Sequence, residues 1–192
     1  MKKKYGIIGN PIEHSLSPVL HNYWFRKYEI DANYSIIDVK ESEISAIIKK
    51  LKNEDVSGIN VTLPYKQKIV PHLSRLVNDA LITSSVNTVY LDDKKLLIGE
   101  NTDVFGLQAA YLKEVDNSSK KKTLVIGAGG VSPSVILALQ KSGVKDISII
   151  NRTKEKCIFL KKKFNNLKVL NWEELEEKIK NYDIIINATS LG

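Results

Sequence analysis

The segment that most constrains the fold runs from Thr123 to Leu139 and reads "TLVIGAGGVSPSVILAL". A continuous apolar run, typical of a buried strand, leads into a Gly-Ala-Gly-Gly turn and then into a helix start. Glycines let the backbone turn tightly and approach a pyrophosphate, whose charge is met by N–H groups and the positive helix end. Ser132 replaces the usual third glycine, and Pro133 is tolerated in a first helical turn. The segment predicts a nucleotide-binding α/β unit.

The choice of nucleotide is indicated where the next predicted strand, "DISIIN", runs into "RTKEK". An NAD enzyme places an acid at about this position for the ribose hydroxyls. Asn151, Arg152 and Thr153 stand there instead. An arginine fork suits a ribose 2′-phosphate, and Thr153 and Lys156 add a hydroxyl and a second charge. This favours NADP over NAD, the alternative being that Arg152 is a surface charge at a helix start.

Short apolar runs alternate with longer amphipathic runs along the whole chain. Strands are predicted near Tyr5–Ile8, Asn33–Val39, Gly58–Val61, Asn87–Leu91, 123–127, 146–151, around Val169 and over 182–188. Helices are predicted near Pro18–Tyr28, Ser42–Leu51, Arg75–Ile82, Val104–Glu114, Ser134–Lys141, 154–164 and Trp172–Lys180. The alternation favours an α/β fold of two domains. Residues 1–103 are expected to form a substrate domain with a mostly parallel sheet, and residues 104–192 an incomplete Rossmann domain.

Four polar clusters interrupt the first predicted domain: "HSLSP", "NVTLPYK", "VNT" and "GENTD". Each falls where a strand ends or a loop begins, the place where open α/β sheets bind ligands. They offer hydroxyls from Ser15, Ser17 and Thr62, amides from Asn60, Asn87 and Asn101, an ammonium at Lys66 and a carboxylate at Asp103. That inventory suits a small polyhydroxylated acid. Taken singly, each residue also fits a turn or a helix cap, with Ser17 before a proline as the clearest case.

Composition excludes several classes of function. All but three of the 29 cationic residues are lysines, spread among acids, so the net charge of +7 does not indicate a nucleic-acid partner. The apolar run after the basic start is too short for a signal peptide or a membrane span, so a cytoplasmic location without a membrane partner is expected. Cys157 is the only cysteine, and the histidines lack ligand spacing, so no metal site is expected.

Joined in order, the motifs resemble those of shikimate dehydrogenase, from Tyr5 to Gly192: "GNPIEHSLSP", "GINVTLPYKQ", "VNT", "GENTDVFG", "VIGAGG", "NRT" and "INATSLG". The resemblance implies an oxidoreductase that reversibly reduces 3-dehydroshikimate to shikimate with NADPH, in aromatic amino-acid biosynthesis. It also implies a substrate domain followed by a Rossmann NADP domain, with the active site between them.

The resemblance further implies roles for single residues. Lys66 and Asp103 would be the catalytic pair, and the other shikimate contacts would be Ser15, Ser17, Thr62 and Asn87, with Asn60 close by. The cofactor residues would be Gly127, Ala128, Gly129, Gly130 and Val131 at the pyrophosphate, Asn151, Arg152, Thr153 and Lys156 at the adenosine phosphate, and Thr189 nearby. Hydride delivered to a ketone leaves an alkoxide, so a lysine that donates a hydrogen bond and then a proton lowers the barrier. The carboxylate would orient that ammonium and a neighbouring substrate hydroxyl.

Family members continue past the "NATS" stretch, so the chain is expected to be truncated or incompletely sequenced. By the resemblance, the further segment contributes substrate contacts and closes the nicotinamide pocket, and slow or absent turnover is expected without it. Two alternatives stay open: a quinate/shikimate dehydrogenase that prefers NAD, and a noncatalytic substrate-binding fragment. A monomer and a homodimer are both compatible with the sequence.

Overall fold

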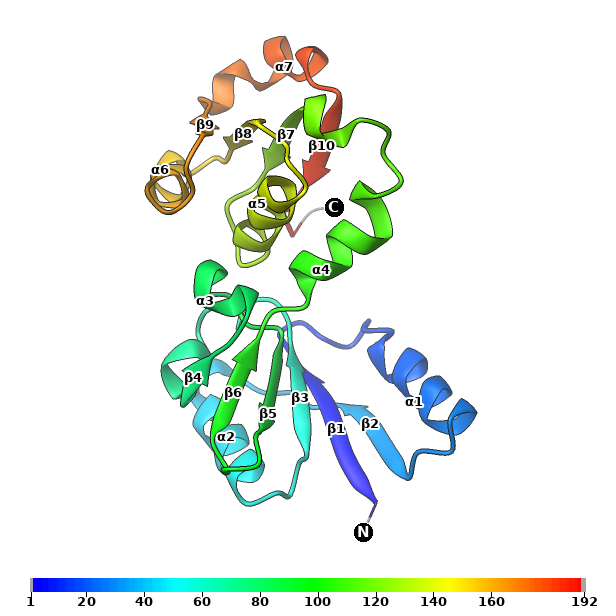
Figure 1. Cartoon of the computed structure of the whole chain (residues 1–192). Helices are drawn as coiled ribbons and strands as arrows, with labels where there is room; N and C mark the ends of the chain where they lie inside the picture. Colours follow the sequence, from blue (N-terminus) through cyan, green and yellow to red (C-terminus); the bar gives the residue numbers. More distant parts are fainter. Residues whose placement is uncertain (1, 191–192) are drawn as a thin grey trace. The chain divides into compact units, whose positions relative to one another are not determined.

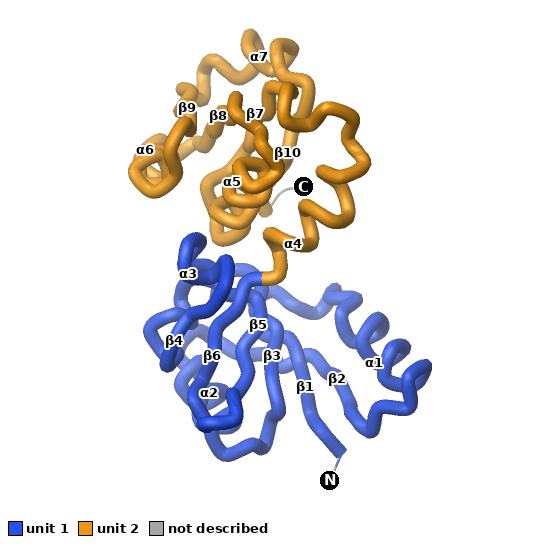
Figure 2. The backbone as a smooth tube through the Cα atoms, in the orientation of Figure 1, with its two compact units in different colours: residues 1–101 blue, residues 102–192 orange. Residues whose placement is uncertain are grey.

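A computed structural model describes residues 2–190 of the chain. The chain divides into two compact units, Met1–Asn101 (unit 1) and Thr102–Gly192 (unit 2), drawn in separate colours in Figure 2. Each unit has its own sheet and its own hydrophobic core (Figure 1). The assignment of one unit to substrate and the other to cofactor remains a prediction.

Unit 1 is built on a six-stranded sheet with the order β2-β1-β3-β5-β6-β4. Its elements are β1 (Lys3–Ile8), α1 (Ser17–Lys27), β2 (Ala32–Ile36), η1 (Glu41–Glu43), α2 (Ile44–Lys52), β3 (Gly58–Val61), η2 (Val70–His72), β4 (Arg75–Leu76), α3 (Asp79–Thr83), β5 (Thr88–Leu91) and β6 (Leu97–Glu100). Strand β1 pairs in parallel with β2 and β3, and β4 pairs in parallel with β6. Strand β5 is antiparallel to both of its neighbours, β3 and β6. The residues that precede β5 therefore lie at the same sheet edge as the residues that follow β1, β3 and β6.

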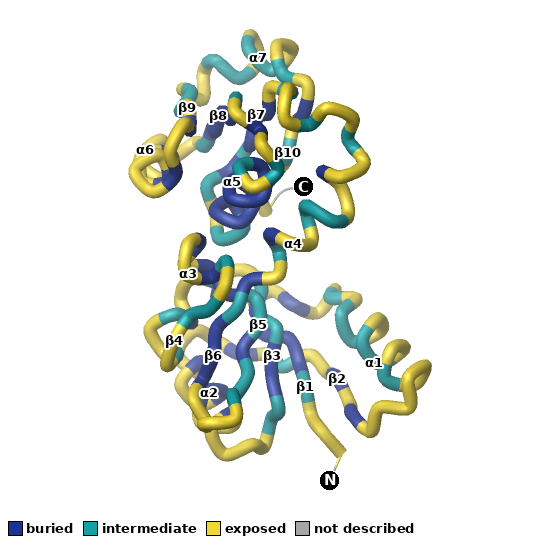
Figure 3. Tube along the Cα trace, viewed as in Figure 1, coloured by how far each residue is buried: buried dark blue, intermediate teal, exposed yellow. Residues whose placement is uncertain are grey.

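Helices α1 and α2 pack on opposite faces of this sheet. Ile7 belongs to the small cluster that Phe25 of α1 joins, whereas Ile8 belongs to the cluster of α2. Neighbouring residues of a strand point to opposite faces, so the two helices cover different sides. Helix α2 buries an apolar stripe at helical spacing, namely Ile44, Ile47, Ile48 and Leu51. As Figure 3 shows, α1 instead keeps half-buried and exposed residues along its length.

The predicted helix over Arg75–Ile82 is wrong in its first half. Residues Arg75–Leu76 form β4, which pairs with β6, and α3 begins only at Asp79. The N–H of Val77 donates to the carbonyl of Gly99 at 3.0 Å. A Cβ on Gly99 would lie 2.5 Å from Leu73 Cδ1 and 3.0 Å from Leu76 Cδ2, so the glycine leaves room for these two side chains beside β6. Long-range pairing therefore overrides the local helical pattern, and β6 itself is a strand that sequence analysis missed.

Unit 2 carries a four-stranded, wholly parallel sheet with the order β10-β7-β8-β9. Its elements are α4 (Asp103–Leu107), the π-helical η3 (Gln108–Leu112), η4 (Ser118–Lys120), β7 (Lys122–Ile126), α5 (Ser132–Lys141), β8 (Asp146–Ile150), α6 (Lys154–Lys163), β9 (Leu167–Val169), η5 (Trp172–Glu174), α7 (Leu175–Lys178), η6 (Ile179–Asn181) and β10 (Ile184–Asn187). Counted by their order in the chain, the strands lie across the sheet as third, second, first and fourth (β9, β8, β7 and β10). This is the arrangement of a doubly wound nucleotide-binding sheet. The strand order reverses between β7 and β10, which defines the switch point where such sheets bind ligands.

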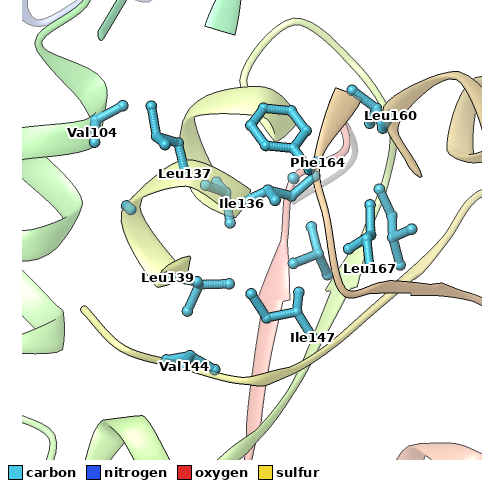
Figure 4. Packing of buried hydrophobic residues seen from close by; sticks show 14 of the residues in the cluster. Val104, Ile136, Leu137, Leu139, Val144, Ile147, Leu160, Phe164 and Leu167 are labelled. Carbon is cyan, nitrogen blue, oxygen red and sulfur yellow. The ribbon is translucent and has the colours of Figure 1, made fainter. Parts of the chain in front are cut away.

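The core of unit 2 forms where α5 and α6 pack against the sheet, as the side chains in Figure 4 show. Ile136 and Leu139 of α5 are fully buried, together with Ile149 of β8. The predicted burial of Cys157 on the apolar face of α6 is confirmed. Burial raises the pKa of its thiol to about 11, so Cys157 stays protonated and packs as a small apolar residue. Within residues 2–190, no helix is both long enough and apolar enough to cross a membrane.

Candidate active site

One edge of the unit 1 sheet gathers the polar clusters of the sequence. Backbone hydrogen bonds join the segments there: Thr62 N–H donates to Ile8 at 2.9 Å, and Asn10 N–H donates to Leu63 at 3.0 Å. On the other side of β3, Val61 N–H donates to the carbonyl of Asn87 at 2.9 Å. The antiparallel direction of β5 is what brings Asn87, which precedes that strand, to the ends of β1 and β3.

Lys66 is held by the backbone and by its neighbour in the loop after β3. Its carbonyl accepts the N–H of Val86 at 2.8 Å, which sets Lys66 beside the segment that contains Asn87. The preceding Tyr65 is 2% exposed, and its hydroxyl donates to the carbonyl of Val39 at 2.8 Å. The lysine is half-buried and extends from a loop that two separate contacts hold in place.

Asp103 is the first residue of α4 in unit 2. It follows the buried Asn101 by two residues. The Asn101 side chain closes the end of β6 by donating to the carbonyl of Ser85 at 2.7 Å. The pairing of Asp103 with Lys66 remains a prediction.

The two serines after β1, Ser15 and Ser17, do not make the contacts that the helix-cap interpretation of Ser17 predicts. Helix α1 begins at Ser17, and the Ser15 hydroxyl accepts the Ser17 N–H at 3.3 Å. The residue at the N-cap is Leu16, and it makes no side-chain cap hydrogen bond, so the cap interpretation of Ser17 is wrong. The Ser17 side chain lies within hydrogen-bonding reach of the Tyr34 phenol. Burial raises the pKa of Tyr34, against a smaller lowering by Ser17, so the phenol remains a neutral hydrogen-bonding group.

Asn60 has most of its hydrogen-bonding capacity engaged within the protein. Its Oδ1 accepts the hydroxyl of Tyr34 at 2.7 Å. Its Nδ2 donates to the carbonyl of Asn87 at 3.1 Å and to Thr88 Oγ1 at 3.3 Å. Sequence analysis missed Tyr34 and Thr88. The only signal was that Thr88 completes the "VNT" cluster, and nothing local distinguishes Tyr34 from any strand tyrosine.

The glycine turn of unit 2 lies at the switch point between β7 and β10. Gly127 has φ +111°, and a Cβ there would lie 2.8 Å from the carbonyl carbon of Ala188. Only glycine combines that backbone conformation with so close an approach. Thr189 follows directly, so the structure places this predicted cofactor residue beside the turn. Leu191 and Gly192, which end the "INATSLG" motif, lie outside the described residues.

Protein groups already accept several N–H groups of the turn. Gly127 N–H donates to Ile150 at 2.8 Å, Ala128 N–H to Asn151 Oδ1 at 3.2 Å, and Gly129 N–H to Ser132 Oγ at 3.0 Å. The Ser132 hydroxyl in turn donates to the Gly127 carbonyl at 3.0 Å. Ser132, which replaces the third glycine, therefore holds the turn in place through hydrogen bonds to Gly127 and Gly129. A pyrophosphate would meet the positive end of α5 rather than these three N–H groups.

Cationic side chains follow β8, where an adenosine phosphate would lie. Arg152, Thr153 and Lys156 are all exposed, and Asn151 shapes the segment by donating its Nδ2 to the carbonyl of Thr153 at 3.0 Å. Among the residues that the structure describes, no carboxylate pairs with Arg152 or Lys156. Guanidinium, hydroxyl and ammonium donors that form no ion pair with a carboxylate fit a 2′-phosphate better than the free ribose hydroxyls of NAD.

Within the described range 2–190, no three His, Cys, Asp or Glu side chains form a group that could hold a metal ion.

Comparisons with known proteins agree with this arrangement. Residues 7–89 match the family model "Shikimate dehydrogenase substrate binding domain", and residues 109–191 match "Shikimate / quinate 5-dehydrogenase". The "Shikimate dehydrogenase (NADP(+))" of Pelagibacter ubique is 45% identical over 192 residues, which cover all of this chain and 71% of that relative.

Solved structures of shikimate dehydrogenases have a similar fold. The crystal structure of shikimate dehydrogenase from Aquifex aeolicus superimposes with a TM-score of 0.91 at 39% identity, over 100% of this chain and 70% of that one. The Thermus thermophilus enzyme, solved with NADP(H) and shikimate, gives a TM-score of 0.84 at 29% identity, over 97% of this chain and 68% of that one.

Proposed function

The chain belongs to the shikimate dehydrogenase family, and on that premise we propose that it interconverts 3-dehydroshikimate and shikimate with NADP(H). The observation that carries the proposal is the polar edge of unit 1, where Lys66 lies beside the segment of Asn87. The edge offers the donors that a polyhydroxylated acid needs, and it supports them on hydrogen-bonded backbone rather than on a mobile loop.

Lys66 acts as the proton donor in this proposal. Its ammonium stabilises the alkoxide that forms at the reduced carbonyl carbon and then transfers a proton to it. Asp103 orients that ammonium and accepts a hydrogen bond from a substrate hydroxyl. Ser15, Ser17, Thr62 and Asn87 complete the set of substrate contacts.

Unit 2 binds the nucleotide through the glycine turn and the segment after β8. NADPH, when bound, supplies the hydride. The helix α5 meets the pyrophosphate with its positive end, and Arg152, with Thr153 and Lys156, binds the 2′-phosphate. Thr189, at the end of β10, lies at the same switch point as Gly127.

Two alternatives are less favoured. A preference for NAD conflicts with the cationic segment after β8, and the Pelagibacter relative is named for NADP(+). A noncatalytic binding fragment would keep the polar edge without needing the lysine. The proposal includes a cytoplasmic location. It also includes assembly as either a monomer or a homodimer.

The test separates binding from turnover. Calorimetric titration of the 192-residue chain with shikimate and with NADPH is expected to show binding of each ligand. An absorbance assay of shikimate-dependent NADP⁺ reduction, repeated with quinate and with NAD⁺, then ranks the substrates and cofactors. Failure to bind shikimate at millimolar concentration would contradict the proposal.

A further inference from the structure

We propose that Tyr34, Asn60 and Thr88 are positioning residues that fix the orientation of the Asn87 side-chain amide. Through them, Asn87 presents its Nδ2 as a hydrogen-bond donor to an oxygen of the substrate. The inference deepens the proposed function and rests on it, because it takes Asn87 as a shikimate contact.

The four side chains form one continuous hydrogen-bond chain within unit 1. The Tyr34 hydroxyl donates to Asn60 Oδ1 at 2.7 Å, and Asn60 Nδ2 donates to Thr88 Oγ1 at 3.3 Å. The Thr88 hydroxyl then donates to Asn87 Oδ1 at 3.0 Å. Asn60 and Thr88 are direct register partners on β3 and β5, so the sheet itself sets the middle link.

A backbone carbonyl decides the orientation of the Asn60 amide and the direction of the first link. The carbonyl of Asn87 lies 3.1 Å from one end of the Asn60 amide, and a carbonyl can only accept. That end must therefore be Nδ2, which turns Oδ1 toward Tyr34 and makes the phenol the donor. The Thr88 hydroxyl accepts from Asn60 and donates its own hydrogen to Asn87 Oδ1. The Asn87 end that faces Thr88 is then Oδ1, and Nδ2 faces the other way.

The first link of the chain is held rigidly. Tyr34 is 4% exposed, and its ring stacks on His21 with centroids 4.2 Å apart and 7° between the planes. The Asn22 side chain bonds both backbone groups of Tyr34, accepting its N–H at 2.9 Å and donating to its carbonyl at 2.7 Å. These contacts fix the ring, and with it the position of the hydroxyl oxygen beside Asn60.

The consequence is a specificity rule for the substrate. A side-chain amide that can flip tolerates either a donor or an acceptor, whereas an Asn87 held by Oδ1 offers only N–H groups. The group it meets must be an oxygen acceptor, such as a hydroxyl or a carbonyl oxygen. A ligand that places an N–H donor there would leave two donors facing each other, which costs the hydrogen bond that an acceptor would make.

The test compares Thr88→Val with Thr88→Ser in the 192-residue chain. Valine keeps the shape and the strand preference but removes the hydroxyl, whereas serine restores it. The expected result is that Thr88→Val binds shikimate about tenfold more weakly by calorimetry, the loss of one well-made hydrogen bond, while Thr88→Ser stays close to wild type. Thr123→Val, the same change on a buried strand of unit 2, is the matched control and should leave shikimate binding unchanged.

A second readout needs no substrate. In nitrogen-labelled protein, the NMR side-chain amide signals of Asn87 and Asn60 should shift in Thr88→Val and return in Thr88→Ser. The inference is overturned if Thr88→Val binds shikimate as the wild type does, or if both amide signals stay in place. A wild-type chain that does not bind shikimate would instead refute the proposed function, and the NMR comparison would still decide the hydrogen-bond chain.

Discussion

Gly127 and Ala188 approach so closely that a Cβ on the glycine would lie 2.8 Å from the alanine carbonyl carbon. The ends of β7 and β10 meet at this contact, and it lies under the predicted pyrophosphate site. The glycine also has φ +111°, where side chains are strained. The geometry of the nucleotide turn therefore depends on one missing methyl group.

Gly127→Ala should destabilise the protein by about 2–4 kcal/mol, because strain and a backbone clash act together. Chemical denaturation measures this loss, and NADPH binding should weaken with it. Gly129→Ala is the matched control, since its nearest neighbour would be the Ala188 carbonyl oxygen at 3.9 Å. Equal losses in the two variants would show that the close approach does not matter.

Lys66→Met should lower the rate of shikimate-dependent NADP⁺ reduction by about 10²–10⁴-fold relative to wild type, since the proton donor is lost. The denaturation midpoint should change little. Lys68→Met is the control, because Lys68 is an exposed residue paired with Glu41, and such surface pairs contribute little. A Lys66→Met chain as active as the Lys68→Met chain would remove the lysine from the mechanism.

Arg152→Ala should weaken NADPH binding by about 10–100-fold and leave NADH binding unchanged, because only NADPH carries the 2′-phosphate. Fluorescence titration of the two cofactors measures the difference. Arg75→Ala, which removes an arginine of unit 1 paired with Asp92 at 3.6 Å, should affect neither cofactor. Parallel losses for NADPH and NADH would place Arg152 away from the phosphate.

Thr123→Val should raise stability by ~1 kcal/mol, because Thr123 is fully buried in β7 and a hydroxyl without a partner costs free energy there. Among the residues that the structure describes, its Oγ1 is the single buried side-chain oxygen or nitrogen that lacks a hydrogen bond. Urea denaturation gives the shift in midpoint. A lower midpoint would mean that the hydroxyl finds a partner, such as a buried water.

Stability should fall as the pH drops below about 6.5, the ordinary pKa of histidine, through the titration of His21. Burial lowers the His21 pKa, so the unfolded chain binds the proton more readily than the folded chain. The contribution is complete above 6.5 and declines until the lowered pKa is passed. His21→Phe keeps a ring beside Tyr34 and should flatten this part of the profile, measured as denaturation free energy against pH. An unchanged slope in that variant would assign the pH dependence to other groups.

The amino-acid sequence by itself determined the features that depend on neighbouring residues. The bounds of β3, the strand, glycine turn and helix of the nucleotide segment, and the cationic segment after β8 all follow from local pattern, because backbone preference and periodicity act over a few positions. The polar residues at the edge of the unit 1 sheet could also be predicted as candidate ligand contacts from the sequence, because they cluster where strands end.

Only the tertiary structure decided the features that depend on distant partners. The direction of β5 carries Asn87 to the ends of β1 and β3, and pairing with β6 turns Arg75–Leu76 into a strand where the local pattern favours a helix. Hydrogen-bond direction is decided in the same way. Asn60, a predicted substrate contact, is hydrogen-bonded to Tyr34 and Thr88, which lie 26 residues before it and 28 after it in the sequence.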